Sequence, residues 1–138
     1  MAGSREREIA GRFAERYRAA EAGPAREIER AVIGGDGGAN GYTSRAQADS
    51  HARVLELGCG VRLLDLGAGC GWPGLYLATS TGCQAVLADV PVEGRVSAMT
   101  RATGEQLSGR AAAVAASARH PPFQPGVFDA IVHTDVLC

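Results

Sequence analysis

Three glycines and two aspartates have the spacing of a site that binds a nucleotide-like ligand. Gly67, Gly69 and Gly71 follow an apolar run directly, and Asp65 precedes them. Glycines let the backbone turn sharply and approach a ligand closely, and the N-terminus of a following helix attracts an anionic group. Asp89 ends the next apolar run, where a carboxylate can accept both hydroxyls of a ribose. We therefore expect a crevice that joins these residues.

The elements that must position this crevice alternate between strands and helices. Such alternation predicts an α/β fold with a Rossmann-like parallel sheet of about four strands, because parallel strands need crossover helices. The expected strands are the apolar runs at residues 61–66, 84–88, 110–117 and 128–133, with helices near 73–82 and 93–103 between them.

Residues 1–43 are expected to form an N-terminal extension of helices and a glycine-rich loop (residues 34–43), ahead of a cofactor-binding domain at residues 44–138. Pro24 is suited to the first turn of a helix. The spacing of Ile28 and Val32 predicts that both face inward from that helix.

Two further helices are expected on either side of the glycine-rich loop. Ile9, Phe13 and Tyr17 recur at a spacing of four residues, which places them on one helix face that we expect to pack on the domain. Ser44 and Gln47 form a capping box that predicts the start of another helix.

Composition excludes several classes of function. The 138 residues carry 14 basic and 15 acidic side chains, a net charge of −1, which argues against a nucleic-acid partner. The chain has no lysine, which excludes a Schiff-base or P-loop lysine. It has no apolar run of about 18 residues that could span a membrane. Its four cysteines lack the spacing of a metal site. We expect a cytoplasmic protein that acts on a small molecule and binds no metal.

Two cofactors compete for the glycine-rich segment. Residues 69–74 match the pattern G-x-G-x-x-G, and Asp89 lies 20 positions beyond Gly69, as in dinucleotide-binding proteins such as NAD-dependent oxidoreductases. In that fingerprint the first glycine follows the strand, which here is Gly67. Counted from Gly67, the third glycine falls on Trp72, and an indole there would impede packing of the helix on the strand. The dinucleotide alternative therefore fits less well.

The sequence resembles the class I S-adenosylmethionine-dependent methyltransferases over about residues 40–138. Three segments in order carry the resemblance: residues 63–71, residues 86–89, and the stretch from Pro121 to Val132. The resemblance implies S-adenosylmethionine as cofactor and an unidentified, small-molecule methyl acceptor.

The resemblance also implies a role for individual residues. Asp65 and the glycine turn would face the methionine part of the cofactor, and Asp89 would hold its ribose. Ser117 stands where the family often has an aspartate near the adenine. The other residues expected at the cofactor are Gly67, Ala68, Gly69, Gly71, Val90, Ala118 and, as a lid, Tyr42.

The methyl-transfer side of the site is expected just after the fourth strand. His133 and Asp135 lie there in the sequence, and His133 is the candidate general base. Methyl transfer depends mainly on alignment of the nucleophile with the methyl group, so it does not require a base.

The chain ends directly after the fourth expected strand, whereas the family has further strands. We therefore expect a truncated fold, whose exposed sheet edge favours self-association. A cofactor-binding module that is non-catalytic or needs a partner stays open as an alternative. Residues 54–60 repeat part of the glycine motif, but no helix follows them, and we interpret them as a helix end and turn.

Overall fold

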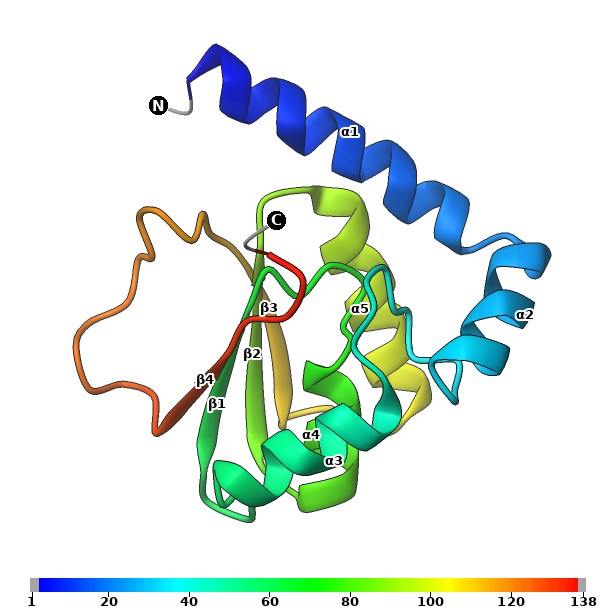
Figure 1. The fold of residues 1–138 in the computed structure, drawn as a ribbon. Helices are drawn as coiled ribbons and strands as arrows, with labels where there is room; N and C mark the ends of the chain where they lie inside the picture. Colours follow the sequence, from blue (N-terminus) through cyan, green and yellow to red (C-terminus); the bar gives the residue numbers. More distant parts are fainter. Residues whose placement is uncertain (1–2, 137–138) are drawn as a thin grey trace.

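A parallel sheet of four strands, in the order β3-β2-β1-β4, forms the centre of the protein (Figure 1). The structure is a computed structural model that describes residues 3–136. All three strand pairs are parallel, as the alternation of elements predicts. The strands are β1 (Arg62–Leu66), β2 (Gln84–Asp89), β3 (Ala111–Ala115) and β4 (Ala130–Val132).

Crossover helices connect the inner strands. Helix α4 (Gly74–Thr81) joins β1 to β2, and α5 (Val92–Gly104) joins β2 to β3. Helix α4 ends at Gly82, which has φ 81° and donates its N–H to the carbonyl of Ala78. Only glycine adopts this left-handed conformation without strain. The expected helix end is confirmed.

Helix α3 (Arg45–Val54) begins with the capping box that the sequence predicts. The Ser44 hydroxyl accepts from the Gln47 N–H at 3.3 Å, and the Gln47 side chain accepts from the Ser44 N–H at 2.8 Å. Ala48 is fully buried. Helices α3, α4 and α5 lie on one face of the sheet (Figure 1), and their side chains build the larger core with Leu63, Leu77 and Leu87.

The opposite face of the sheet carries a smaller core without a helix. Leu64, Ala88 and Ala116 are buried there. Phe123 and Phe128 come from the loop between β3 and β4 and meet edge to face at 4.9 Å. This loop covers the face in place of a helix.

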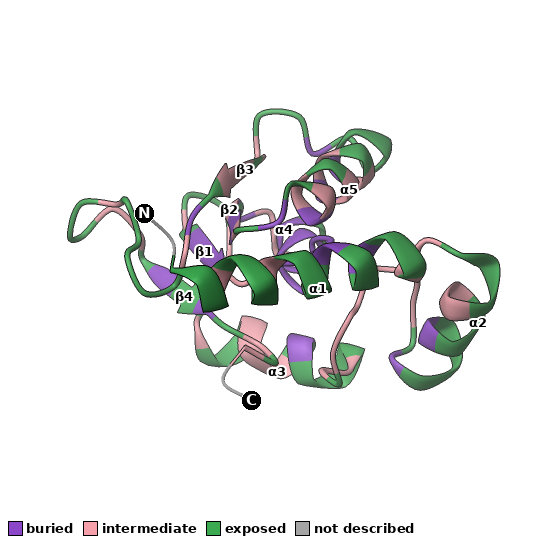
Figure 2. Ribbon diagram, turned by 90° about the horizontal axis from the view of Figure 1, so that it is seen from above, coloured by how far each residue is buried: buried purple, intermediate pink, exposed green. Residues whose placement is uncertain are grey.

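Helix α1 (Ser4–Ala20) crosses above the carboxyl ends of the strands, as the view from above makes clear (Figure 2). Tyr17 is buried, but Ile9 and Phe13 are 43% and 39% exposed, so the expected packing face is only partly covered. No described helix is both long and apolar enough to cross a membrane.

The orientation expected for helix α2 (Gly23–Val32) is wrong. Ile28 and Val32 are 65% and 66% exposed, and the buried residue is Glu29. One oxygen of Glu29 accepts the N–H groups of Gly37 at 2.7 Å and Ala39 at 3.0 Å. The glycine-rich loop has backbone donors that need a partner, and α2 turns a carboxylate rather than an apolar face toward them.

Candidate functional site

The glycine turn after β1 adopts backbone conformations that need glycine. Gly67, Gly69 and Gly71 have φ values of 80°, 51° and 108°, which side chains with a Cβ rarely adopt. The N–H groups of Gly67 and Ala68 both donate to the carbonyl of Ala88, at 2.8 and 3.1 Å. The turn is thereby fixed against the end of β2, where Asp89 follows.

Asp89 lies directly against this turn, as the sequence predicts. Its Oδ2 accepts the Gly69 N–H at 2.7 Å and the Tyr17 hydroxyl at 3.0 Å. Its Oδ1 accepts the Val90 N–H at 2.7 Å. The two β-strand ends therefore bring a carboxylate and the glycine turn together.

Tyr17 is a site residue that sequence reasoning did not identify. Burial, and then the charge of Asp89, raise the pKa of Tyr17 well above its usual range, so the phenol stays neutral and its O–H donates a hydrogen bond to Asp89. The spacing of Tyr17 and Phe13 placed both on one face of α1, but periodicity does not tell what such a face covers.

The position of Asp65 differs from the expectation that it faces the cofactor. Its side chain is 1% exposed, and Oδ2 accepts the Gly74 N–H at 2.8 Å, at the start of α4. Oδ1 is buried and has no hydrogen-bond partner among residues 3–136. The pKa of Asp65 is raised to about 7, chiefly by burial and to a smaller extent by the charge of Asp89, while the hydrogen bond from the Gly74 N–H acts in the opposite direction. Asp65 therefore caps a buried helix start.

A small cavity of about 40 Å³ lies above the glycine turn. This volume is on the order of one water molecule and is far too small for a nucleoside. Asp65, Gly71 and His133 do not line it. The cavity is lined by Phe13, Tyr17, Gly38, Asn40, Gly41, Gly67, Ala68, Gly69, Trp72, Thr134 and Asp135.

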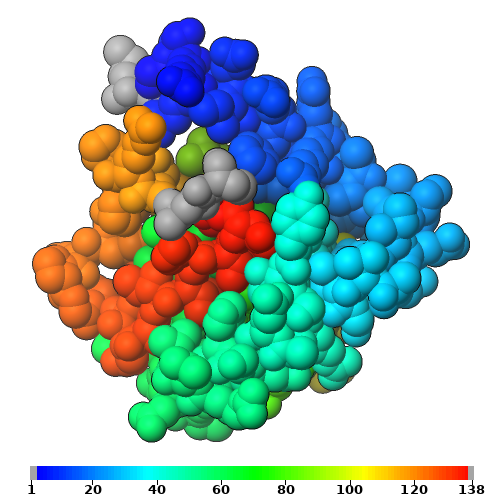
Figure 3. Space-filling view, viewed as in Figure 1, coloured from blue at the N-terminus to red at the C-terminus, as the bar shows by residue number. Residues whose placement is uncertain are grey.

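The glycine-rich loop closes one side of this cavity. Oδ2 of Asp135 accepts the N–H groups of Tyr42 and Thr43 and the Thr43 hydroxyl, at 3.0, 3.2 and 3.0 Å. The Trp72 indole donates to the carbonyl of Thr43 at 2.9 Å. In the space-filling view the loop (cyan) lies beside the C-terminal segment (red) (Figure 3).

Tyr42 does not form the lid that the sequence suggested. Its side chain is 86% exposed, and its backbone N–H bonds Asp135. The preceding Gly41 lies close to the Asp135 carboxylate, so this carboxylate contacts the backbone of the loop and not the Tyr42 ring.

The remaining predicted residues lie around the crevice or below it. Gly71 faces Leu75 and Ala98 in the core rather than the cavity. Val90 is 39% exposed, and Ala118 and His133 are also exposed. The Ser117 hydroxyl donates to Oε1 of Glu6 in α1, at 2.9 Å.

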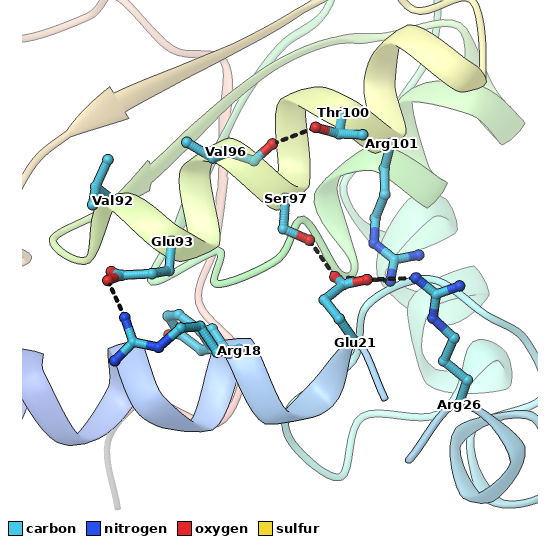
Figure 4. A pocket seen from close by; sticks show the side chains of 10 residues that line it. Arg18, Glu21, Arg26, Val92, Glu93, Val96, Ser97, Thr100 and Arg101 are labelled. Atoms are coloured by element: carbon cyan, nitrogen blue, oxygen red, sulfur yellow. Dashed lines mark hydrogen bonds and ion pairs between the residues drawn. The ribbon is translucent and has the colours of Figure 1, made fainter. Parts of the chain in front are cut away.

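A larger cavity of about 500 Å³ opens beside the crevice, between α1 and α5 (Figure 4). Arg18 pairs with Glu93 across it. Further along, Glu21 accepts from the Ser97 hydroxyl and pairs with Arg26 and Arg101. These contacts hold α1 against the domain.

Comparison with solved structures finds the same fold in longer proteins. Phospholethanolamine N-methyltransferase 2 of Haemonchus contortus, solved with S-adenosylhomocysteine, has a TM-score of 0.66 at 20% identity. A putative S-adenosyl-L-methionine-dependent methyltransferase of Methanococcus maripaludis has a TM-score of 0.65 at 17% identity. The [4+2]-cyclase SpnF has a TM-score of 0.61 at 28% identity.

The chain matches only part of these structures. The alignments cover 88%, 87% and 76% of this chain, but 28%, 50% and 43% of the respective structures. No curated protein matches the chain.

The sequence itself matches a protein-family profile over more than half of its length. The match runs from residue 64 to residue 138, and the family is described as a methyltransferase domain. It includes the glycine turn, Asp89 and all of β2 to β4, which are the parts that build the crevice. The chain belongs to the methyltransferase domain family.

Proposed function

We propose that this chain binds S-adenosylmethionine and serves the transfer of its methyl group to a small-molecule acceptor. The observation that carries the proposal is the contact between Asp89 and the Gly69 N–H at the carboxyl ends of β1 and β2. In open parallel sheets, ligands bind outside the carboxyl ends of the strands. Neighbouring structures of this fold include one solved with S-adenosylhomocysteine.

The polar groups of the crevice fit an adenosyl cofactor. Asp89 offers carboxylate oxygens that can accept ribose hydroxyls, and the turn at Gly67 and Gly69 exposes backbone without a Cβ. The cavity of about 40 Å³ does not fit such a ligand while Tyr17 bonds Asp89. The polar groups of the crevice therefore match the cofactor once the Tyr17 side chain has moved out of the crevice.

When bound, the cofactor supplies a methyl group on a sulfonium centre. In this chain Asp89 would hold the ribose, and the Gly69 N–H keeps that carboxylate in place. Trp72 and the loop fixed by Asp135 line one side of the cavity. These residues act by binding and orientation, which lower the barrier by pre-aligning the reactants.

No proton transfer is assigned to His133. Its side chain is exposed and does not line the cavity, so its role as a general base stays a prediction. Thr134 and Asp135 line the cavity on this side, and Oδ2 of Asp135 is occupied by the loop.

A small acceptor is favoured by charge. With a net charge of −1, the chain lacks the excess of basic residues that nucleic-acid binding requires.

A second candidate function is cofactor binding without methyl transfer. The solved [4+2]-cyclase SpnF is 28% identical to this chain, so proteins of this fold carry out other reactions. Incubation of the chain with labelled S-adenosylmethionine and a panel of small hydroxyl, amine and thiol compounds separates the two. Labelled product supports methyl transfer, and cofactor binding without product across the panel supports the second candidate.

Titration calorimetry with S-adenosylhomocysteine tests the claim that both candidate functions share, which is that the chain binds the cofactor. We expect saturable binding, weakened about tenfold or more by Asp89→Ala, because a charge-assisted hydrogen bond is lost. The matched control is Asp129→Ala, whose carboxylate bonds Arg62 at the opposite end of the sheet. No saturable binding up to millimolar ligand would refute the proposal, and equal loss in both variants would refute the assignment to Asp89.

A further inference from the structure

We propose that helix α1 is an occluding helix, which holds the adenosine-binding groups of the crevice and must be displaced by the cofactor. The proposal rests on the proposed function and adds a regulatory contact to the same site. Two groups that the family resemblance assigns to adenosine are occupied by α1 side chains. Asp89 accepts the Tyr17 hydroxyl at 3.0 Å, and the Ser117 hydroxyl donates to Glu6 at 2.9 Å.

The two occluding residues share one face of α1. Glu6 and Tyr17 are eleven positions apart, which is about three turns and about 16 Å along a helix. Phe13 lies on the same face, packs against Tyr17 with its ring tilted and the ring centres 5.9 Å apart, and lines the small cavity. One face of α1 therefore spans the crevice from the end of β2 to the end of β3.

Tyr17 sits in a notch made by two glycines. A Cβ at Gly94 would lie 2.9 Å from the Tyr17 ring, and a Cβ at Gly69 would lie 3.3 Å from it. The ring therefore occupies the space that the glycine turn leaves open for a ligand. With the ring in place only about 40 Å³ remains above the turn.

The attachment of α1 suits it to movement. Of its 17 residues only Ala14 and Tyr17 are buried, so few apolar contacts oppose its release. Its carboxyl-terminal end is held more firmly, because Glu21 accepts from Ser97 and pairs with Arg26 and Arg101 (Figure 4). This cluster can act as a pivot while the Tyr17 and Glu6 contacts and the Arg18–Glu93 ion pair open.

The cofactor and α1 then compete for the same carboxylate oxygen. Ribose hydroxyls at Asp89 would replace the Tyr17 hydroxyl, so only molecules with an open helix can bind the cofactor. The apparent affinity is therefore the intrinsic affinity multiplied by the fraction of molecules that are open. Because such coupling is reciprocal, the bound cofactor must destabilise the docked helix.

Two measurements with S-adenosylhomocysteine test the proposal. Hydrogen exchange of the intact chain should show faster exchange of the α1 amides when the ligand is bound. In calorimetry, Tyr17→Phe and Glu6→Ala should each bind the ligand about three- to tenfold more tightly, as expected for loss of one hydrogen bond. The control Glu15→Ala makes the same charge change as Glu6→Ala at an exposed position of α1, and its affinity should stay unchanged.

The outcomes separate this proposal from the proposed function. Slower exchange of α1 with ligand, or weaker binding by Tyr17→Phe, means that the helix clamps the cofactor and overturns occlusion. Equal affinities in all variants overturn occlusion alone. No binding by any variant overturns the proposed function as well. Glu6→Ala and the exchange measurement on the unmodified chain decide the matter even where Tyr17→Phe fails to fold.

Discussion

The hydroxyl of Tyr17 lies 3.0 Å from Oδ2 of Asp89, although 72 positions separate the two residues in the sequence. The same oxygen accepts the Gly69 N–H at 2.7 Å. A neutral phenol, whose pKa burial and Asp89 raise, thus completes the hydrogen bonds of a carboxylate that would otherwise face the crevice. The N-terminal helix and the methyltransferase fold therefore meet at one functional group.

The first prediction concerns Asp65 and pH. Burial raises its pKa from 3.8 to about 7, so the folded protein binds a proton between these values that the unfolded chain does not. The contribution of Asp65 to the free energy of unfolding is fully present below about pH 4 and is lost as the pH rises to about 7. At about 1.4 kcal/mol per pKa unit the loss is on the order of 4 kcal/mol.

Asp65→Asn should remove this loss, because the amide oxygen can still accept the Gly74 N–H and carries no charge. Denaturant unfolding at pH 5 and pH 8 gives the free energy of unfolding of wild type and variant. The difference between the two proteins at each pH removes the contribution that the other carboxylates make to both. We expect Asp65→Asn to be more stable than wild type at pH 8, and we expect this gain in stability to be larger at pH 8 than at pH 5. A gain of equal size at both pH values would contradict a raised pKa.

The second prediction concerns Glu29, the buried carboxylate of α2. A single oxygen accepts the N–H groups of Gly37 and Ala39. Glu29→Ala leaves both donors unsatisfied and should lower the free energy of unfolding by about 2–4 kcal/mol. Glu29→Gln keeps an oxygen there and should cost about 1 kcal/mol. The neighbouring exposed Glu27→Gln serves as control, and equal losses in Glu29→Ala and Glu29→Gln would refute the role of that oxygen.

The sequence allowed the sheet to be predicted more completely than the parts around it. The strands, the end of α4 at Gly82 and the capping box at Ser44 all depend on short-range patterns, and the structure has them close to the predicted bounds. The contact of Asp89 with the glycine turn follows from parallel strands ending at one edge.

The residues that sequence reasoning placed wrongly depend on long-range contacts. Ile28 and Val32 have the periodicity of an inner face, yet α2 buries Glu29 because the glycine-rich loop presents two backbone donors. Asp65 precedes the glycines, but its strand face points to α4 rather than to the crevice. No local pattern indicated that Tyr17 would reach Asp89.

The third prediction concerns the free edge of the sheet. Within the described sheet β4 pairs only with β1, and Ile131 on it is 54% exposed. An unpaired apolar strand edge favours pairing with a second copy. We expect light scattering to give a mass that rises with protein concentration, and Ile131→Lys to suppress the rise, because a charged side chain resists burial at a strand edge. A monomer at all concentrations would refute the prediction, as would unaltered association of the variant.

The fourth prediction concerns Gly41 and the loop over the cavity. A Cβ at this position would lie 2.1 Å from Oδ2 of Asp135, the oxygen that holds Tyr42 and Thr43. Gly41→Ala must therefore displace the loop and with it the carbonyl of Thr43, which accepts from the indole of Trp72. Trp72 is the only tryptophan of the chain and is 8% exposed, so tryptophan fluorescence reports on the surroundings of this one indole. We expect a red shift of emission in Gly41→Ala, because the indole gains contact with solvent.

Gly35→Ala is the matched control, since no atom of the described residues lies within 4 Å of a Cβ there. An unshifted spectrum in Gly41→Ala, or an equal shift in both variants, would mean that Asp135 does not hold the loop over the cavity.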